Sequence, residues 1–162
     1  MKKNYLIIIL DNVKTLFYAL IIAVLIRSLF FQPFYIPSSS MEPTLLIGDR
    51  IFVKKFEYGY SKHSFPFSPP FFSGRFFKQK PKYGDLVVFK TPNDNRTDYI
   101  KRLIGLPGDT IQFKNGKLLL NKEEIYRTKI INNYLIRCGI NTQEVNAYSE
   151  RLPNGKEYIA VY

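Results

Sequence analysis

The chain has 162 residues, and once its apolar N-terminus is set aside about 120 remain, enough for one sheet-based domain of ordinary size. Its 24 Lys and Arg against 13 Asp and Glu give a net charge of +11, but this excess is spread along the chain, so we expect no nucleic acid partner. A single cysteine, Cys138, excludes an intramolecular disulfide, a cysteine-built zinc site and a Cys-x-x-Cys redox motif.

The N-terminal part of the chain contains a long apolar run, residues 16–34, with one charged residue, Arg27. As a helix this run would span roughly 28 Å, close to the thickness of the bilayer core. A cleavable secretory signal is the alternative, since a basic start and small residues at 38–40 fit its outline. A buried core helix is a weaker alternative, because the run has no polar face.

The charges around this run predict its orientation. Lys2, Lys3 and Lys14 precede it, and positive residues favour the cytoplasmic side of a membrane. We therefore expect a cytoplasmic N-terminus, a transmembrane anchor and an extracytoplasmic β-rich domain, at residues 1–14, 15–34 and 35–162.

Beyond residue 34 the helical pattern ends, and short β-type runs separated by turn signals predict a mainly β domain of antiparallel sheets. The expected strands are at 50–56, 84–91, 99–104, 110–113 and 117–120. Asn115-Gly116 predicts a tight hairpin between the last two, and Leu106-Pro107-Gly108-Asp109 predicts a type II turn.

Residues 58–81 interrupt these strands with six phenylalanines, at positions 65, 67, 71, 72, 76 and 77, mixed with prolines and basic residues. Aromatic rings beside lysines favour the bilayer interface, so this Phe-rich loop either contacts membrane lipid or covers an edge of the sheet. His63 lies in the same stretch and is expected to be a solvated loop histidine. A Ser/His/Asp triad would need it, because the chain has no other histidine.

Two segments contain the residues for a different nucleophilic chemistry. Ser40 lies in Ile36-Pro-Ser-Ser-Ser-Met-Glu-Pro-Thr-Leu45, and Lys101 lies in Asp98-Tyr-Ile-Lys-Arg-Leu-Ile-Gly-Leu-Pro-Gly-Asp109. A serine nucleophile needs a nearby neutral base, and a lysine can act as one when apolar neighbours disfavour its charged form. The alternative is that residues 38–40 form only a polar turn and that Lys101 and Arg102 are solvated strand residues. The sequence separation of Ser40 and Lys101 alone does not show whether they are close in space.

These segments, with Gly48-Asp49 and Tyr83-Gly84-Asp85 between them, resemble the bacterial type I signal peptidases over roughly residues 28–113. Members of that family are membrane-bound Ser/Lys proteases that remove signal peptides. The resemblance implies an antiparallel-sheet, signal-peptidase-like catalytic domain behind one transmembrane helix, located in the bacterial cytoplasmic membrane. It implies no metal or organic cofactor, and its partners would be signal peptides of exported preproteins.

The resemblance also implies roles for individual residues. Ser40 would be the nucleophile, Lys101 the general base and Ser38 an oxyanion-hole donor. Shallow pockets for small substrate side chains would be built from Ile36, Pro37, Met41, Leu45, Ile51, Asp98, Tyr99 and Ile100.

One family feature is missing from this sequence, a C-terminal Gly-Asp-Asn-Arg box followed closely by serine and aspartate. We therefore expect either a fragment or a degenerate copy. Two alternatives to a general signal peptidase follow: an inactive membrane-anchored remnant that at most binds signal peptides, and a specialised Ser/Lys peptidase of a secretion system. A self-cleaving repressor is disfavoured, because it would carry a DNA-binding domain in place of the anchor.

Overall fold

The structure is a computed structural model that describes the chain except for residues 1–3, 66–69, 71–73 and 139–140. The chain forms two compact units. Unit 1 comprises Met1–Phe34 and Phe52–Lys80, and unit 2 comprises Tyr35–Ile51 and Pro81–Tyr162.

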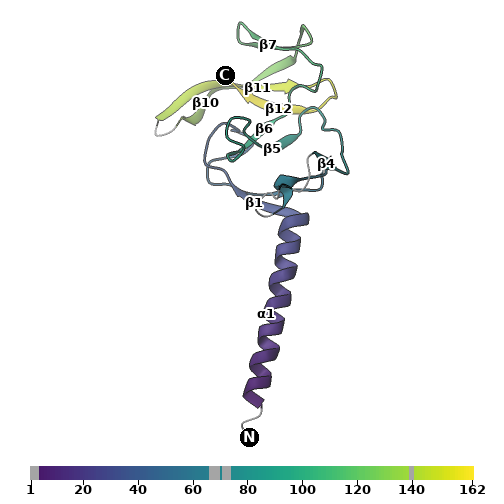
Figure 1. The fold of residues 1–162 in the computed structure, drawn as a ribbon. Coiled ribbons are helices and arrows are strands. Elements are labelled where there is room, and N and C mark those ends of the chain that lie inside the picture. The colour runs from purple at the N-terminus through teal and green to yellow at the C-terminus, as the bar shows by residue number, and fades with distance from the viewer. Residues whose placement is uncertain (1–3, 66–69, 71–73, 139–140) are drawn as a thin grey trace. The chain divides into compact units, whose positions relative to one another are not determined.

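Unit 1 begins with one uninterrupted helix, α1 (Asn4–Leu29), drawn in purple in Figure 1. Within its span Tyr5–Leu29, an 18-residue window has a mean hydropathy of 2.0 and no residue buried against the rest of the described chain, so the helix is long and apolar enough to cross a membrane. The helix begins before the predicted run and ends five residues before Phe34. It ends early because Pro33 cannot donate a ladder hydrogen bond within a helix, and Phe31–Tyr35 forms strand β1 instead.

Short strands follow the helix. β1 pairs with β2 (Arg50–Lys54), and β3 (Tyr60–Ser61) pairs with β4 (Arg75–Phe76). The Tyr60 hydroxyl donates a 2.7 Å hydrogen bond to the Leu29 carbonyl, which satisfies one of the free carbonyls at the end of α1.

The Phe-rich loop is partly described. Phe76 and Phe77 are exposed, at 54% and 85%, whereas Phe65 is half-buried. Phe67, Phe71 and Phe72 lie outside the described residues, so both interpretations of the loop stay predictions. The prediction of a solvated loop histidine is wrong, because His63 is half-buried in the short 3-10 helix η1 (Lys62–Ser64).

Unit 2 is built from three antiparallel sheets, which agrees with the predicted mainly β class. β5 (Leu86–Lys90) pairs with β6 (Asp98–Arg102). The second sheet contains β7 (Ile111–Lys114), β8 (Lys117–Leu120) and β9 (Glu123–Glu124). The third contains β10 (Tyr126–Cys138), β11 (Asn141–Arg151) and β12 (Glu157–Val161).

The turn predictions in unit 2 are confirmed. Lys114 pairs with Lys117 across the hairpin, and the two loop residues, Asn115 and Gly116, have φ of 50° and 70°. Positive φ at both positions is the geometry that a two-residue hairpin requires. In the turn of residues 106–109, Gly108 has φ of 99° and the Asp109 N–H bonds the Leu106 carbonyl over 2.9 Å.

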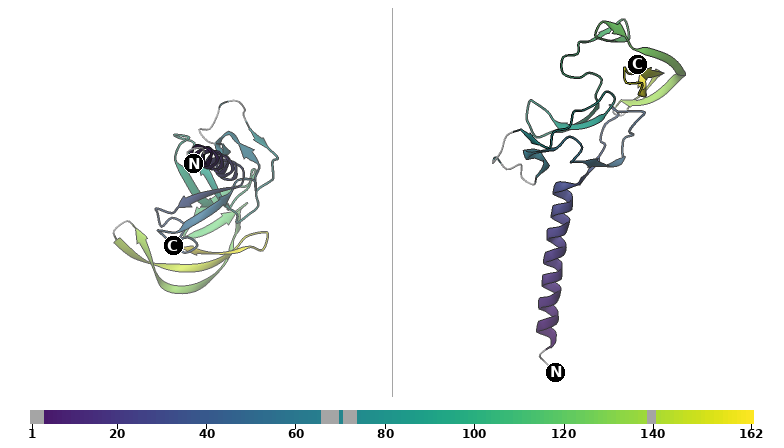
Figure 2. Two further views of the ribbon diagram at one scale, coloured as in Figure 1. Left: turned by 90° about the horizontal axis from the view of Figure 1, so that it is seen from below. Right: turned by 90° about the vertical axis from the view of Figure 1, so that its right-hand side faces the viewer.

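The long β10–β11 hairpin was not predicted. Its two strands form a curved ribbon, visible in both views of Figure 2. The pairing register shifts between Lys129 and Ile131, and again before Tyr134. Such bulges break the alternation of apolar and polar residues on which a strand prediction depends.

The core of unit 2 is small. Leu120, Ile125 and Leu152 are buried together, with Tyr83, Ile104, Leu118 and Tyr158 packed around them. Gly84 lies against this core, where an added Cβ would come within 3.0 Å of Leu152 Cδ1. The buried core residues therefore come from β8, the segment after β9 and the turn before β12.

Candidate active site

Ser40 lies in a tight turn of unit 2 that is anchored on both sides. Ile36 and Met41 are buried, with 3% and 7% of their surfaces exposed, whereas Ser40 is exposed. Backbone hydrogen bonds from Glu42 N to the Ser39 carbonyl and from Leu45 N to the Met41 carbonyl close the turn. Apolar anchors thus hold the backbone while the serine hydroxyl faces outward.

Lys101 is presented by strand β6, where it pairs with Val87 of β5. Side chains alternate along a strand, so Lys101 shares its face with Tyr99, and across the pairing with Val87 and Phe89. The Tyr99 ring centre lies 5.9 Å from Lys101 Nζ, and the Phe89 and Tyr99 rings meet edge to face at 6.2 Å. Lys101 is half-buried on this aromatic face.

The turn and the strand bring the two predicted catalytic groups together. The Lys101 amine donates a hydrogen bond to Ser40 Oγ over 2.5 Å, and Ser38 Oγ lies 3.3 Å from the same oxygen. Proton transfer between a nucleophile and its base requires a separation of about 3 Å. The three side chains therefore form one hydrogen-bonded row, and in the described part of the chain no group of three or more His, Cys, Asp or Glu side chains could hold a metal ion.

The residues expected to line substrate pockets are distributed around this row. Ile36 and Met41 lie in or beside the Ser40 turn, and Tyr99 lies beside Lys101. By strand alternation, Asp98 and Ile100 face away from Lys101. The remaining three predicted residues differ in exposure: Leu45 and Ile51 are half-buried and Pro37 is exposed. A substrate-binding role for all eight stays a prediction.

Sequence reasoning missed the contribution of β5. Val87 and Phe89 share the face of Lys101, and Phe89 is 39% exposed. The pairing register of β5 and β6 is the signal that identifies them. That register depends on the geometry of the connecting loop, and loop length alone does not predict this geometry.

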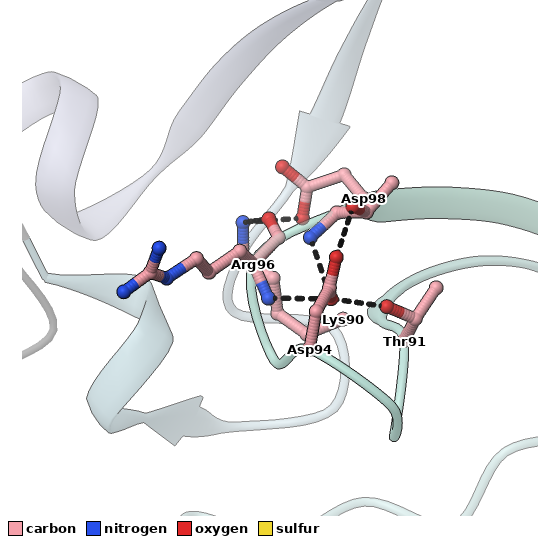
Figure 3. A network of polar contacts seen from close by, with 6 residues as sticks. Lys90, Thr91, Asp94, Arg96 and Asp98 are labelled. Atoms are coloured by element: carbon pink, nitrogen blue, oxygen red, sulfur yellow. Dashed lines mark hydrogen bonds and ion pairs between the residues drawn. The ribbon is translucent and has the colours of Figure 1, made fainter.

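Asp94 fixes this loop, as Figure 3 shows. Its carboxylate accepts hydrogen bonds from the Thr91 hydroxyl, from the Thr97 hydroxyl at 2.5 Å, and from the N–H groups of Arg96 and Thr97 at 2.9 and 3.0 Å. These four bonds, led by the one from Thr91, hold the pKa of Asp94 well below its usual range.

A second pair of charges lies where the two strands enter this loop. Lys90 Nζ forms a 2.8 Å ion pair with Asp98 and donates a 2.7 Å hydrogen bond to the Arg96 carbonyl. The Asp98 carboxylate therefore already forms an ion pair within the hairpin. A slip of one residue in this pairing would turn Lys101 to the other face, so the loop contacts support the position of the amine.

We expect Asp94→Asn to lower the thermal unfolding midpoint at neutral pH. Because the pKa of Asp94 is lower in the folded chain, its ionised form stabilises the fold above about pH 4, and this contribution is lost as the pH falls further. The difference between the wild type and Asp94→Asn should therefore shrink in acid, as measured by circular dichroism from pH 7 to pH 2. Glu124→Gln, which breaks an exposed pair with Lys117, is the control and should change little.

Comparison with known proteins identifies the family of the chain. A family model described as signal peptidase, peptidase S26, matches residues 9–159. The chain belongs to this family. The match extends well beyond the residues 28–113 that carry the sequence resemblance, and it includes the Ser40 turn, β6 and most of the C-terminal sheet.

Individual relatives support the same assignment. A signal peptidase I from Rickettsia felis and another from Rickettsia akari are each 43% identical over 145 residues, which is 88% of this chain and 53% of theirs. A signal peptidase I from Rickettsia canadensis is 42% identical over 149 residues, 91% of this chain and 55% of its own. The chain thus spans about half the length of the curated relatives that it matches.

Proposed function

We propose that this chain acts as a serine endopeptidase that removes N-terminal signal peptides from exported preproteins, with Ser40 as nucleophile and Lys101 as base. The observation that carries the proposal is the 2.5 Å contact between Lys101 Nζ and Ser40 Oγ. Membership of the signal peptidase family supports the same reaction.

The proposed mechanism has two steps. In the first, the neutral Lys101 amine accepts the Ser40 proton while Ser40 Oγ attacks the scissile carbonyl, and Lys101 then gives this proton to the leaving amine as the peptide bond breaks and an ester forms. In the second, Lys101 accepts a proton from water as the water oxygen attacks the ester, and it returns this proton to Ser40 Oγ as the acid product leaves. The Ser38 hydroxyl, 3.3 Å from Ser40 Oγ in the free chain, would turn to the oxyanion together with the Ser40 N–H.

The proposed substrate carries small side chains next to the cut. Ile36, Met41 and Tyr99 are bulky residues beside the nucleophile and the base, and bulky walls leave room for little more than a methyl group.

The proposed location is the outer face of a bacterial cytoplasmic membrane, with the N-terminus in the cytoplasm. α1 supports an anchor, and Lys2 and Lys3 before it support the orientation. Exposure of Phe76 and Phe77 supports contact of unit 1 with membrane lipid, because aromatic side chains favour the bilayer interface.

A cleavage assay tests the proposal. The chain would be placed in liposomes with an exported preprotein, and the cut would be mapped by mass spectrometry. We expect a single cut after a small residue, and loss of cleavage when that residue is replaced by phenylalanine. A cut that ignores this replacement would contradict the proposed substrate class.

The same assay separates the alternatives. Binding of the signal peptide without any cut would favour the inactive remnant. A cut in one precursor of a secretion system, but in no general preprotein, would favour the specialised peptidase.

Ser38→Ala should slow the reaction without preventing substrate binding. Loss of one oxyanion donor lowers kcat by about 10²–10³-fold in serine proteases, and the donor is used mainly in the transition state. We therefore expect KM to change little. Steady-state kinetics would check this, with Ser39→Ala as the neighbouring control, and a rise in KM at constant kcat would assign Ser38 to substrate binding instead.

A further inference from the structure

Arg102 follows Lys101 on β6 but points to the opposite face of the hairpin. Its guanidinium has three partners in unit 2. Nη2 donates a 2.8 Å hydrogen bond to Thr44 Oγ1, Nη1 donates a 3.1 Å bond to the Gly84 carbonyl, and the group lies 5.0 Å from the centre of the Tyr158 ring. Arg102 therefore links segments that are far apart in the sequence.

The contact with Thr44 reaches the turn that carries the nucleophile. Thr44 follows Ser40 by four residues, and the turn between them is closed by the bond from Leu45 N to the Met41 carbonyl. One end of the Arg102 guanidinium thus holds the Ser40 turn, while the backbone of Arg102 continues directly from Lys101. A single side chain joins the two halves of the candidate active site.

The other contacts keep the guanidinium in place. The Gly84 backbone is itself bonded to the residue that follows β6, with Gly84 N donating to the Leu103 carbonyl over 2.7 Å. Tyr158, which stacks on the guanidinium, donates a 2.5 Å hydrogen bond to the carboxylate of Glu150, a residue with 1% of its surface exposed. Burial among these groups lowers the pKa of Arg102 from its usual value, yet a guanidinium remains charged at any physiological pH.

We propose that Arg102 and Thr44 are positioning residues, which hold the Ser40 turn against β6 so that the Lys101 amine meets the Ser40 hydroxyl. The proposal rests on the proposed Ser/Lys reaction for its catalytic consequence. Its physical basis is that a displacement of 1 Å at a catalytic pair can cost about 100-fold in rate. The planar fork of arginine suits this task, because it bonds Thr44 and Gly84 from two nitrogens at once.

Thr44→Val is the most specific test, since it removes the hydroxyl and preserves the shape. We expect kcat to fall about tenfold with KM nearly unchanged, and Thr44→Ser to restore the rate. Thr110→Val is the matched control, because Thr110 is also an exposed threonine of unit 2, and it should cleave normally. An unchanged kcat in Thr44→Val would overturn the proposal.

The pairing itself is tested with a double-mutant cycle. We expect Arg102→Met to lower kcat by about 10–100-fold, and Thr44→Val to add little to it, because the shared contact is already lost. Effects that multiply in the double variant would contradict the pairing. Thermal unfolding of each variant shows whether a lower rate reflects only a loss of folded protein.

A second readout does not require cleavage. Acylation of Lys101 by a small amine-directed reagent would be measured by mass spectrometry relative to Lys117, which pairs with Glu124 away from the site. Loosening the Ser40 turn should uncover the Lys101 amine, so Thr44→Val should speed its labelling about threefold or more while Thr110→Val does not. Faster labelling in a chain that cuts nothing would retain the positioning role and reject the proposed function. If Thr44→Val changed neither the labelling rate nor kcat in a chain with Ser40-dependent cleavage, the proposed function would be retained and the positioning role rejected.

Discussion

Ser40→Ala should reduce preprotein cleavage by about 10⁴-fold or more, because serine proteases lose most of their rate when the nucleophile is removed. The substituted chain should still fold, since Ser40 is exposed and the turn is held by Ile36 and Met41. Cleavage would be followed by gel electrophoresis of the precursor in liposomes, over a range of enzyme concentrations.

Ser39→Ala is the matched control for this experiment. Ser39 lies in the same turn, and its backbone carbonyl accepts a hydrogen bond from the Glu42 N–H, which alanine retains. We expect nearly normal cleavage from this variant. Full activity of Ser40→Ala would exclude Ser40 as the nucleophile, whatever the other variants show.

Lys101→Met and Lys101→Arg should both abolish cleavage, and the second is the more informative. Methionine keeps an unbranched stem but has no base. Arginine keeps the charge and can still stack on Tyr99, yet its guanidinium stays protonated and cannot accept the Ser40 proton. Initial rates for both variants should fall by about 10⁴-fold, comparable with Ser40→Ala, because residues that act as a unit fail together.

Lys90→Met supplies the control, because Lys90 lies on the same hairpin but pairs with Asp98 beside the connecting loop. It should lose some stability and keep most of its activity. If Lys101→Arg cleaved at a substantial rate, the positive charge of Lys101 would matter and its basicity would not.

The elements that could be predicted from the sequence are those specified by local chemistry. Asn115-Gly116 adopts positive φ at both positions and forms the expected hairpin, and Gly108 supplies the expected turn. The apolar run before residue 34 predicted a helix, but α1 begins earlier than that run and also ends earlier, the second because Pro33 already lies in a strand. Strand predictions failed for β10 and β11, where bulges interrupt the alternating pattern.

The candidate site was predicted by resemblance and could not have been predicted from spacing. Nothing in the sequence separation of Ser40 and Lys101 indicates that a turn and a strand bring them to 2.5 Å. The contacts that support this pair were missed for the same reason. The bond between Arg102 and Thr44 and the loop held by Asp94 depend on tertiary register, which single-sequence patterns do not encode.

Trapping of the nucleophile tests the central claim most directly. A signal-peptide analogue with a phosphonate ester in place of the scissile carbonyl would be incubated with the chain in liposomes, and the modified residue would be found by mass spectrometry after proteolysis. We expect the adduct on Ser40, and its loss in Lys101→Met. An adduct on another side chain, or labelling of Ser40 at the same rate without Lys101, would contradict the account.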